Sequence, residues 1–253
     1  MNELHYYDVA KKANKKIYWH PGIKRISQIA KKSRFILDVG CGEGTKLAKI
    51  IEKGKDATGI DISHFAIQKA KKQFPNIKFI KTKDEIIPFT SNIFDLVYST
   101  FVLEHTKNQE LFINEMIRVT AINGMIVILC PNYGSPNRRS PVSIEQPLPK
   151  LFLGITKDFS FSTNNHLSFT KVTPKKIFKN PDDDTTCEPY LYDLIKYIHR
   201  NNNLKIIQSS SLWEIDDGVN SLHQRIFKFL GQKNTFPFKY WGPQLFLVIK
   251  KLS

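Results

Sequence analysis

The sequence predicts an α/β fold in which helices cover both faces of a mostly parallel, doubly wound sheet. Two observations lead to this prediction. Five strand-type runs alternate with helix-type patterns between residues 35 and 132, and such a βαβ series builds a parallel sheet through right-handed crossovers. The first run, Phe35–Val39, is also followed directly by the glycine-rich loop Gly40–Gly44, as is typical of a buried strand that turns sharply into a helix.

The glycine loop is suited to close contact with a ligand. Its alternating glycines can adopt positive φ angles and let a ligand approach the backbone without meeting a Cβ. A dinucleotide-binding fingerprint would need glycine or alanine where this chain has Thr45. Asp38 and Glu43 bring two carboxylates to the loop, which disfavours a pyrophosphate and favours a ligand with positive charge.

The elements on either side of this loop follow from hydrophobic spacing. Residues 1–34 predict two helices that break near His20–Gly22, and the second helix carries isoleucines at helical spacing toward the sheet. The second and third strands are expected at Lys55–Ile60 and Ile77–Ile80, with a helix at Ser63–Phe74 between them.

An acid stands at the end of the second strand. Asp61 follows the glycine loop by roughly 20 residues, where a carboxylate can accept hydrogen bonds from both ribose hydroxyls of an adenosine. The same carboxylate could instead cap the next helix, but Ser63 is available for that role. We therefore expect Asp61 to bind a ligand.

The later elements continue the alternation and then change character. We expect a fourth strand at Phe94–Tyr98, a helix at 111–119, a turn at Asn123–Gly124 and a fifth strand at Met125–Asn132. From Tyr133 to about Pro189 the periodicity fades, and such a stretch is usually an irregular functional lid. A helix at Tyr190–Arg200, strands at Leu204–Ser210 and Leu245–Lys250, and a mixed region at Trp213–Lys233 complete the prediction.

Three stretches together resemble a known family. The run ILDVGCGEGT at 36–45 resembles motif I of class I S-adenosylmethionine (SAM)-dependent methyltransferases, TGIDIS at 58–63 resembles their second motif, and FDLVYSTFVLEH at 94–105 resembles the stretch after their cofactor motifs. SAM suits the acidic loop because it carries a sulfonium and an ammonium but no phosphate. The resemblance covers residues 35–132 and implies a Rossmann-like, seven-stranded sheet with an antiparallel C-terminal edge, SAM as cofactor and methyltransferase activity.

The resemblance also implies the residues that hold the cofactor. Asp61 would bind the ribose, and Ile62 would contact the adenine. The family usually has an acid for the adenine amino group where this chain has Lys83, so we take the next residue, Asp84, as the candidate. The full predicted set is Asp38, Gly40, Cys41, Gly42, Asp61, Ile62, Asp84 and Ser99.

The chemistry that the family performs needs little acid-base machinery. A nucleophile attacks the sulfonium methyl in line, so positioning of the reactants supplies most of the rate. If the acceptor is a hydroxyl, a base helps, and His105 and His166 are the candidates because neutral imidazole accepts a proton near pH 7. For each histidine the alternative is a packed or solvated side chain. The sequence predicts no metal site, which argues against a magnesium-dependent mechanism.

The cysteines follow no disulfide or metal pattern, which indicates free thiols in a reducing compartment. Cys130 lies at a strand end where some RNA cytosine methyltransferases carry a nucleophile, and we keep that role as an alternative. In the lid, Arg138 and Arg139 are candidates for a phosphate or carboxylate clamp, with two solvated arginines as the alternative.

The length, the net charge and the apolar runs of the chain limit its domain organisation and its binding partners. The 253 residues suffice for one domain over 1–253, with a cofactor core at 35–132 and a substrate-side lid at 133–189. The net charge of +15 is compatible with an anionic partner. We expect a small-molecule, sugar or lipid-precursor acceptor methylated at oxygen or carbon; an RNA acceptor and a non-catalytic binding protein are the alternatives. No apolar run is long enough to span a bilayer, so we expect a cytoplasmic protein, with peripheral membrane contact through the basic, aromatic lid left open.

Overall fold

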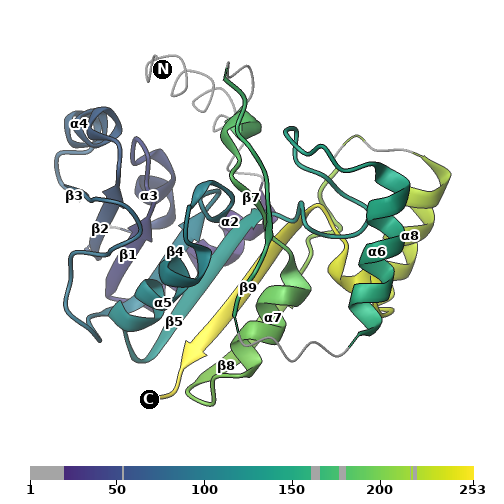
Figure 1. The fold of residues 1–253 in the computed structure, drawn as a ribbon. Coiled ribbons are helices and arrows are strands. Elements are labelled where there is room, and N and C mark those ends of the chain that lie inside the picture. The colour runs from purple at the N-terminus through teal and green to yellow at the C-terminus, as the bar shows by residue number, and fades with distance from the viewer. Residues whose placement is uncertain (1–19, 53, 161–165, 177–180, 217, 219–220) are drawn as a thin grey trace.

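Seven strands form one sheet at the centre of the protein (Figure 1). The computed structural model describes residues 20–52, 54–160, 166–176, 181–216, 218 and 221–253, so the first predicted helix, before His20, lies outside them. The strands lie in the order β3-β2-β1-β4-β5-β9-β8. Their bounds are β1 Phe35–Val39, β2 Asp56–Asp61, β3 Lys78–Lys81, β4 Phe94–Thr100, β5 Thr120–Pro131, β8 Leu204–Ser210 and β9 Gln244–Lys251.

The strand directions agree with the prediction. Strands β1 to β5 pair in parallel, whereas β9 is antiparallel to both of its neighbours, β5 and β8. The mostly parallel sheet with an antiparallel C-terminal edge is therefore confirmed.

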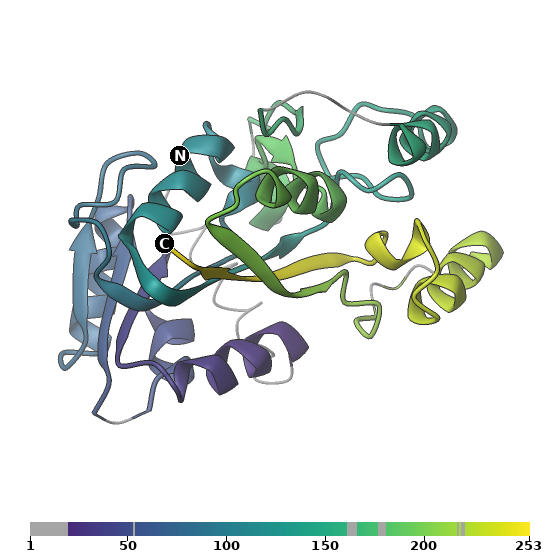
Figure 2. The same ribbon diagram turned by 90° about the horizontal axis from the view of Figure 1, so that it is seen from below.

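Helices cover both faces of this sheet (Figure 2). On one face lie α2 Pro21–Ala30, α3 Thr45–Ile50 and α4 His64–Gln73, and on the other lie α5 Gln109–Val119 and α7 Leu191–His199. Each group buries its apolar side chains in a separate hydrophobic cluster with one face of the sheet.

The two clusters follow from the period of a strand. Ile126 and Ile128 of β5 belong to the cluster under α5 and α7, whereas Val127 and Leu129 belong to the cluster on the opposite face. Successive side chains of a strand point to opposite faces, so a strand buried on both faces must be apolar throughout. This explains why the central strands show continuous apolar runs rather than alternation.

The predicted turn at Asn123–Gly124 differs in detail from the structure. Both residues lie within β5, where Asn123 has a φ of 67° and the pairing of β5 with β4 shifts register between Phe94 and Leu96. The backbone thus makes a left-handed irregularity inside a longer strand rather than a turn before a shorter one.

The prediction that residues 133–189 are irregular is wrong in part. They contain helix α6, Pro147–Phe159, and a two-stranded sheet made of β6 Thr170–Lys171 and β7 Cys187–Glu188. The apolar residues of α6 do recur at helical spacing, at Leu148, Leu151, Phe152, Ile155 and Phe159, so the prediction overlooked a helix signal. Leu148, Phe152 and Leu153 nevertheless remain exposed.

A second unpredicted helix lies beside α6. Helix α8, Leu222–Gln232, falls in the region predicted only as mixed. The two helices form one end of the molecule (Figure 1) and pack on a cluster built around Tyr190, Trp213 and Trp241. Among the described residues, no helix has the length and apolar character needed to cross a membrane.

Candidate active site

The glycine loop leaves β1 at the carboxyl edge of the sheet and is held to the end of β2. The backbone N–H groups of Gly40 and Cys41 both donate to the carbonyl of Ile60, at 2.8 and 2.9 Å. A Cβ on Gly40 would lie 2.3 Å from the Val102 side chain, whereas a Cβ on Gly42 would meet nothing within 4 Å. The loop is therefore packed at Gly40 and faces open space at Gly42, where a ligand can approach its backbone.

The Asp61 carboxylate is bound to this loop. Its two oxygens accept from the backbone N–H groups of Gly42, at 2.8 Å, and Ser63, at 2.9 Å. The Ser63 hydroxyl accepts from the N–H of Ala66 at 3.1 Å and caps α4, as predicted. Burial raises the pKa of Asp61, although these backbone donors oppose the shift. The next side chain, Ile62, is 64% exposed at the same edge.

A second carboxylate lies directly below the loop. Asp38 is fully buried beside the Tyr98 hydroxyl. Burial raises its pKa to about 7, while the Lys46 ammonium nearby favours the charged form. The Lys46 Nζ donates to the carbonyl of Thr100 at 2.8 Å. A buried carboxylate is costly unless positive charge compensates it, so this position favours a ligand with a positive charge.

Three other predicted cofactor residues have different surroundings. The Cys41 side chain is buried behind the loop against Gly59. The Ser99 hydroxyl donates to the carbonyl of Val39 at 2.9 Å and thereby ties β4 to β1. Asp84 is exposed and has a φ of 48° in the tight turn after β3. Their contacts with a cofactor stay predictions, and for Ser99 the hydroxyl is already engaged.

His105 lies in a cluster of acids that the sequence did not reveal. It belongs to the short 3-10 helix η2, Leu103–His105. Its Nε2 lies 3.6 Å from Glu104 and its Nδ1 lies 3.0 Å from Asp184. Burial alone would lower the pKa of His105, but Glu104 and Asp184 outweigh that effect and raise the pKa to about 9. A raised pKa disfavours the neutral form that a general base requires, and the catalytic role of His105 stays a prediction.

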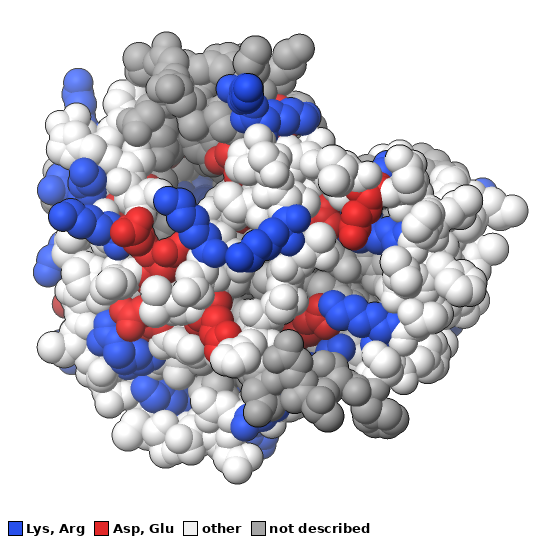
Figure 3. Space-filling model, in the orientation of Figure 1, with Lys and Arg blue, Asp and Glu red and all other residues white. Residues whose placement is uncertain are grey.

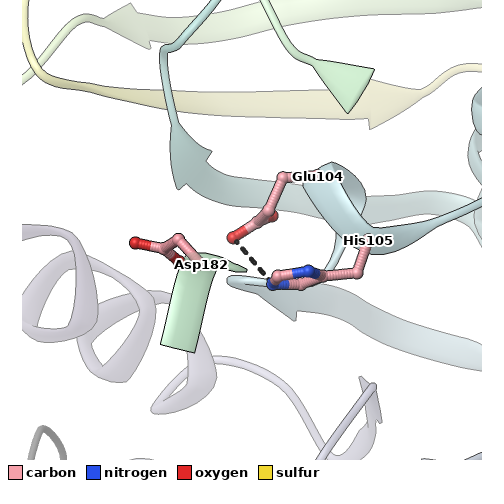
Figure 4. A group of neighbouring side chains, drawn as sticks. All are labelled: Glu104, His105 and Asp182. Carbon is pink, nitrogen blue, oxygen red and sulfur yellow. Dashed lines mark ion pairs between the residues drawn. The ribbon is translucent and has the colours of Figure 1, made fainter. Parts of the chain in front are cut away.

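The acids reach His105 because a later segment docks on η2. The N–H of Thr186 donates to the Glu104 carbonyl at 2.8 Å, and its hydroxyl donates to the Thr106 carbonyl at 2.7 Å. This docking brings Asp182 of the 3-10 helix η3, Pro181–Asp184, toward Glu104 and His105 (Figure 4). The only sequence signal was the Glu-His pair after the fourth strand, because the pairing with Asp182 is a tertiary contact.

The second histidine is in a different setting. The His166 side chain is 80% exposed, and its Nδ1 lies 3.4 Å from Glu110 near the start of α5. Its exposure fits the solvated alternative, and its catalytic role stays a prediction.

The remaining lid and cysteine hypotheses lose support. Cys130 is fully buried, and burial raises the pKa of its thiol well above the usual range, so it is not available as a nucleophile. Arg138 donates to the carbonyl of Trp241 and lies over the Trp213 ring. Arg139 donates to the carbonyl of Glu145. Both guanidinium groups thus take part in contacts within the protein.

The comparisons with known proteins agree with this geometry. Residues 37–128 match a family model described as a methyltransferase domain. Residues 37–128 form a methyltransferase domain. The residues of this methyltransferase domain fit SAM, because the buried Asp38 carboxylate and the open space at Gly42 suit its cationic groups.

Curated relatives match part of this chain. Demethylmenaquinone methyltransferase of Renibacterium salmoninarum is 32% identical over 93 residues, which cover 37% of this chain and 39% of that protein. Ajmaline N-methyltransferase of Rauvolfia serpentina is 27% identical over 168 residues, which cover 63% of this chain and 58% of that protein. This chain thus spans less than two thirds of the length of either relative.

The fold around the methyltransferase domain also has solved counterparts. The plantazolicin methyltransferase BamL, crystallised with a triazolic desmethylPZN analog and SAH, superposes with a TM-score of 0.56 and 16% identity. The superposition covers 99% of this chain and 90% of BamL. At this identity the likeness concerns the fold.

Proposed function

We propose that this protein transfers the methyl group of SAM to an oxygen or carbon atom of a small-molecule, sugar or lipid-precursor acceptor. The observation that carries the proposal is the open space at Gly42, whose backbone N–H is bound by the Asp61 carboxylate. When bound, SAM supplies the methyl group and a good leaving group. The protein therefore has mainly to orient the two reactants and keep water out.

Each part of SAM has a candidate partner. Asp38 and Lys46 offer opposite charges to the ammonium and the carboxylate of the methionine moiety. The Asp61 oxygens each accept one backbone N–H and retain lone pairs for ribose hydroxyls. Ile62 offers exposed apolar surface for the adenine, and Asp84 is our candidate for its amino group.

The acceptor side belongs to the segment 133–189. It begins where β5 ends, and its last residues dock on η2, next to His105. The names of the curated relatives state demethylmenaquinone and ajmaline as acceptors, which supports a small organic molecule here. His105 and the acids around it are the candidates for contact with the reacting group.

A lipid-like acceptor agrees with an unusual surface on the two unpredicted helices. We define the apolar helix pair by seven exposed side chains, Leu148, Phe152, Leu153 and Phe159 of α6 and Leu222, Ile226 and Phe229 of α8. Figure 3 shows a largely uncharged surface over this end of the molecule. Arg225, Lys228 and Lys233 lie on or next to α8, so apolar and basic groups occur together, as in helices that bind membrane surfaces.

We propose that the apolar helix pair binds a membrane surface peripherally. The test is cosedimentation of the full chain with vesicles of neutral lipid, with and without anionic lipid. We expect binding that anionic lipid strengthens and that Phe152→Ser with Phe229→Ser reduces at least 10-fold. Equal binding by the variant would remove this surface from the proposal.

The function itself is tested by transfer of isotope-labelled methyl groups from SAM into a fractionated cell extract. Label in the lipid or metabolite fraction supports the proposed acceptor class. Label in RNA would overturn it and favour the alternative suggested by the net charge of +15. No label in any fraction, with SAM still bound, would favour a non-catalytic binding protein.

A further inference from the structure

Three ionisable side chains converge next to the glycine loop without a role in holding SAM. They are Glu104 and His105 from η2 and Asp182 from η3, and one potential ligand atom of each lies within 4.8 Å of the others (Figure 4). Val102, which precedes η2, packs on Gly40. The Lys46 ammonium acts on the carboxylates of both Glu104 and Asp38, so the cluster borders the cofactor site.

Glu104 has an unusual environment for a carboxylate. It is fully buried, and neither oxygen accepts a hydrogen bond from another residue that the structure describes. Its ion pair with His105 is loose, at 3.6 Å, and in Figure 4 its carboxylate points into the space between His105 and Asp182. A buried carboxylate without hydrogen bonds is strongly destabilising unless a positive ligand compensates it.

The His105 and Asp182 side chains are each oriented by a contact with a further residue. Asp184 lies 3.0 Å from the Nδ1 of His105 and so leaves Nε2 on the side of Glu104. The Tyr133 hydroxyl donates to an Asp182 oxygen at 2.8 Å. Residues that bind metals are oriented in this manner, with a carboxylate behind the imidazole and a donor behind the ligating carboxylate.

We propose that Glu104, His105 and Asp182 form a binding site for one divalent transition-metal cation, such as Mn²⁺ or Zn²⁺. One imidazole nitrogen and two carboxylate oxygens are a ligand set for these ions, whereas Mg²⁺ and Ca²⁺ prefer oxygen alone. A dication also balances the three acids, Glu104, Asp182 and Asp184, better than a single imidazolium does.

The cation has a use in methyl transfer, and this part of the inference rests on the proposed function. A cation at this position can bind an acceptor hydroxyl and lower the pKa of that hydroxyl. The hydroxyl proton passes to water, the oxygen bonds to the methyl carbon, and the carbon–sulfur bond breaks to give a methyl ether and S-adenosylhomocysteine.

The test measures metal binding without turnover. Mn²⁺ is titrated into the metal-stripped full chain, and free Mn²⁺ is followed by its electron paramagnetic resonance signal, with Zn²⁺ as competitor. We expect the wild type to bind one Mn²⁺ ion, which Zn²⁺ displaces. Glu104→Gln and Asp182→Asn should each weaken the affinity for Mn²⁺ by about 10-fold or more. Glu110→Gln is the matched control, because Glu110 is also a carboxylate beside a histidine, and it should leave Mn²⁺ affinity unchanged.

SAM affinity, measured calorimetrically in each variant, reports on folding independently of the metal. The proposal is overturned if the wild type binds neither Mn²⁺ nor Zn²⁺, or if Glu104→Gln binds Mn²⁺ like the wild type while SAM affinity is retained. The proposal would also be overturned if an organic amine, rather than Mn²⁺ or Zn²⁺, bound to Glu104, His105 and Asp182. Metal binding without any methyl transfer would support the metal site and refute the proposed function. Methyl transfer without metal binding would support the proposed function and refute the metal site.

Discussion

The substitution Gly42→Ala tests whether the open space in front of the glycine loop is the site where SAM binds. Gly42 has a φ of 55°, and a Cβ placed on it would meet no protein atom within 4 Å. The added methyl therefore has two costs: left-handed backbone strain of about 1–2 kcal/mol, and exclusion of whatever occupies the space in front of the loop.

Gly54 provides the matched control for this experiment. It has a φ of 90°, and a Cβ there also meets nothing within 4 Å, but it lies after α3, away from the glycine loop. Both alanine variants should lose about 1–2 kcal/mol of unfolding free energy in a urea titration. Crowding of the ligand adds about 1–3 kcal/mol in Gly42→Ala alone, which corresponds to a SAM affinity roughly 5- to 150-fold weaker by calorimetry. If Gly42→Ala bound SAM as tightly as Gly54→Ala, the open space at Gly42 would not be the cofactor site.

Three further predictions concern single side chains. Asp61→Asn should weaken SAM binding about 10-fold or more in the same calorimetric assay, because hydrogen bonds to charged groups contribute about 1.5–3 kcal/mol. The amide would also turn a donor toward the N–H of Gly42 or Ser63. An unchanged SAM affinity would speak against the role of Asp61 in binding the ribose. The pKa of Asp38 is raised to about 7, so the native state binds the extra proton and unfolding free energy should fall as pH rises from about 4 to about 7. Urea unfolding across that range should show a smaller decline in Asp38→Asn, and an identical slope would show that Asp38 is not the group responsible. Cys130→Ala should retain methyl transfer in the labelling assay, because the buried thiol is no nucleophile, and a complete loss with SAM still bound would restore that role.

The cofactor half of the protein could be predicted because its signals are local. The apolar run of β1, the alternating glycines and Asp61 at the end of β2 are each readable within a few residues, and a parallel sheet brings strand ends to one edge. The cap of α4 by Ser63 followed from the same kind of short-range rule.

The acceptor half could not be predicted in the same way. The contact between His105 and Asp184 depends on the docking of Thr186 on the Glu104 backbone, which no spacing in the chain encodes. That contact also raises the pKa of His105 above its ordinary value, which the order of residues in the chain does not indicate. Helix α6 is different, because its apolar residues have helical spacing and the prediction overlooked them among the prolines and polar residues of the segment 133–189.

The position of β9 constrains the order in which the sheet can assemble. It is the strand between β5 and β8, and β8 has no other neighbour in the sheet. During synthesis β8 emerges first but cannot join until β9 follows, and meanwhile the apolar edge of β5 stays unpaired. An open edge of this kind can pair with another chain, and late, long-range pairing slows folding. The interval between the emergence of β5 and that of β9 is therefore the period in which this chain is most exposed to aggregation, and one in which a chaperone would have most effect.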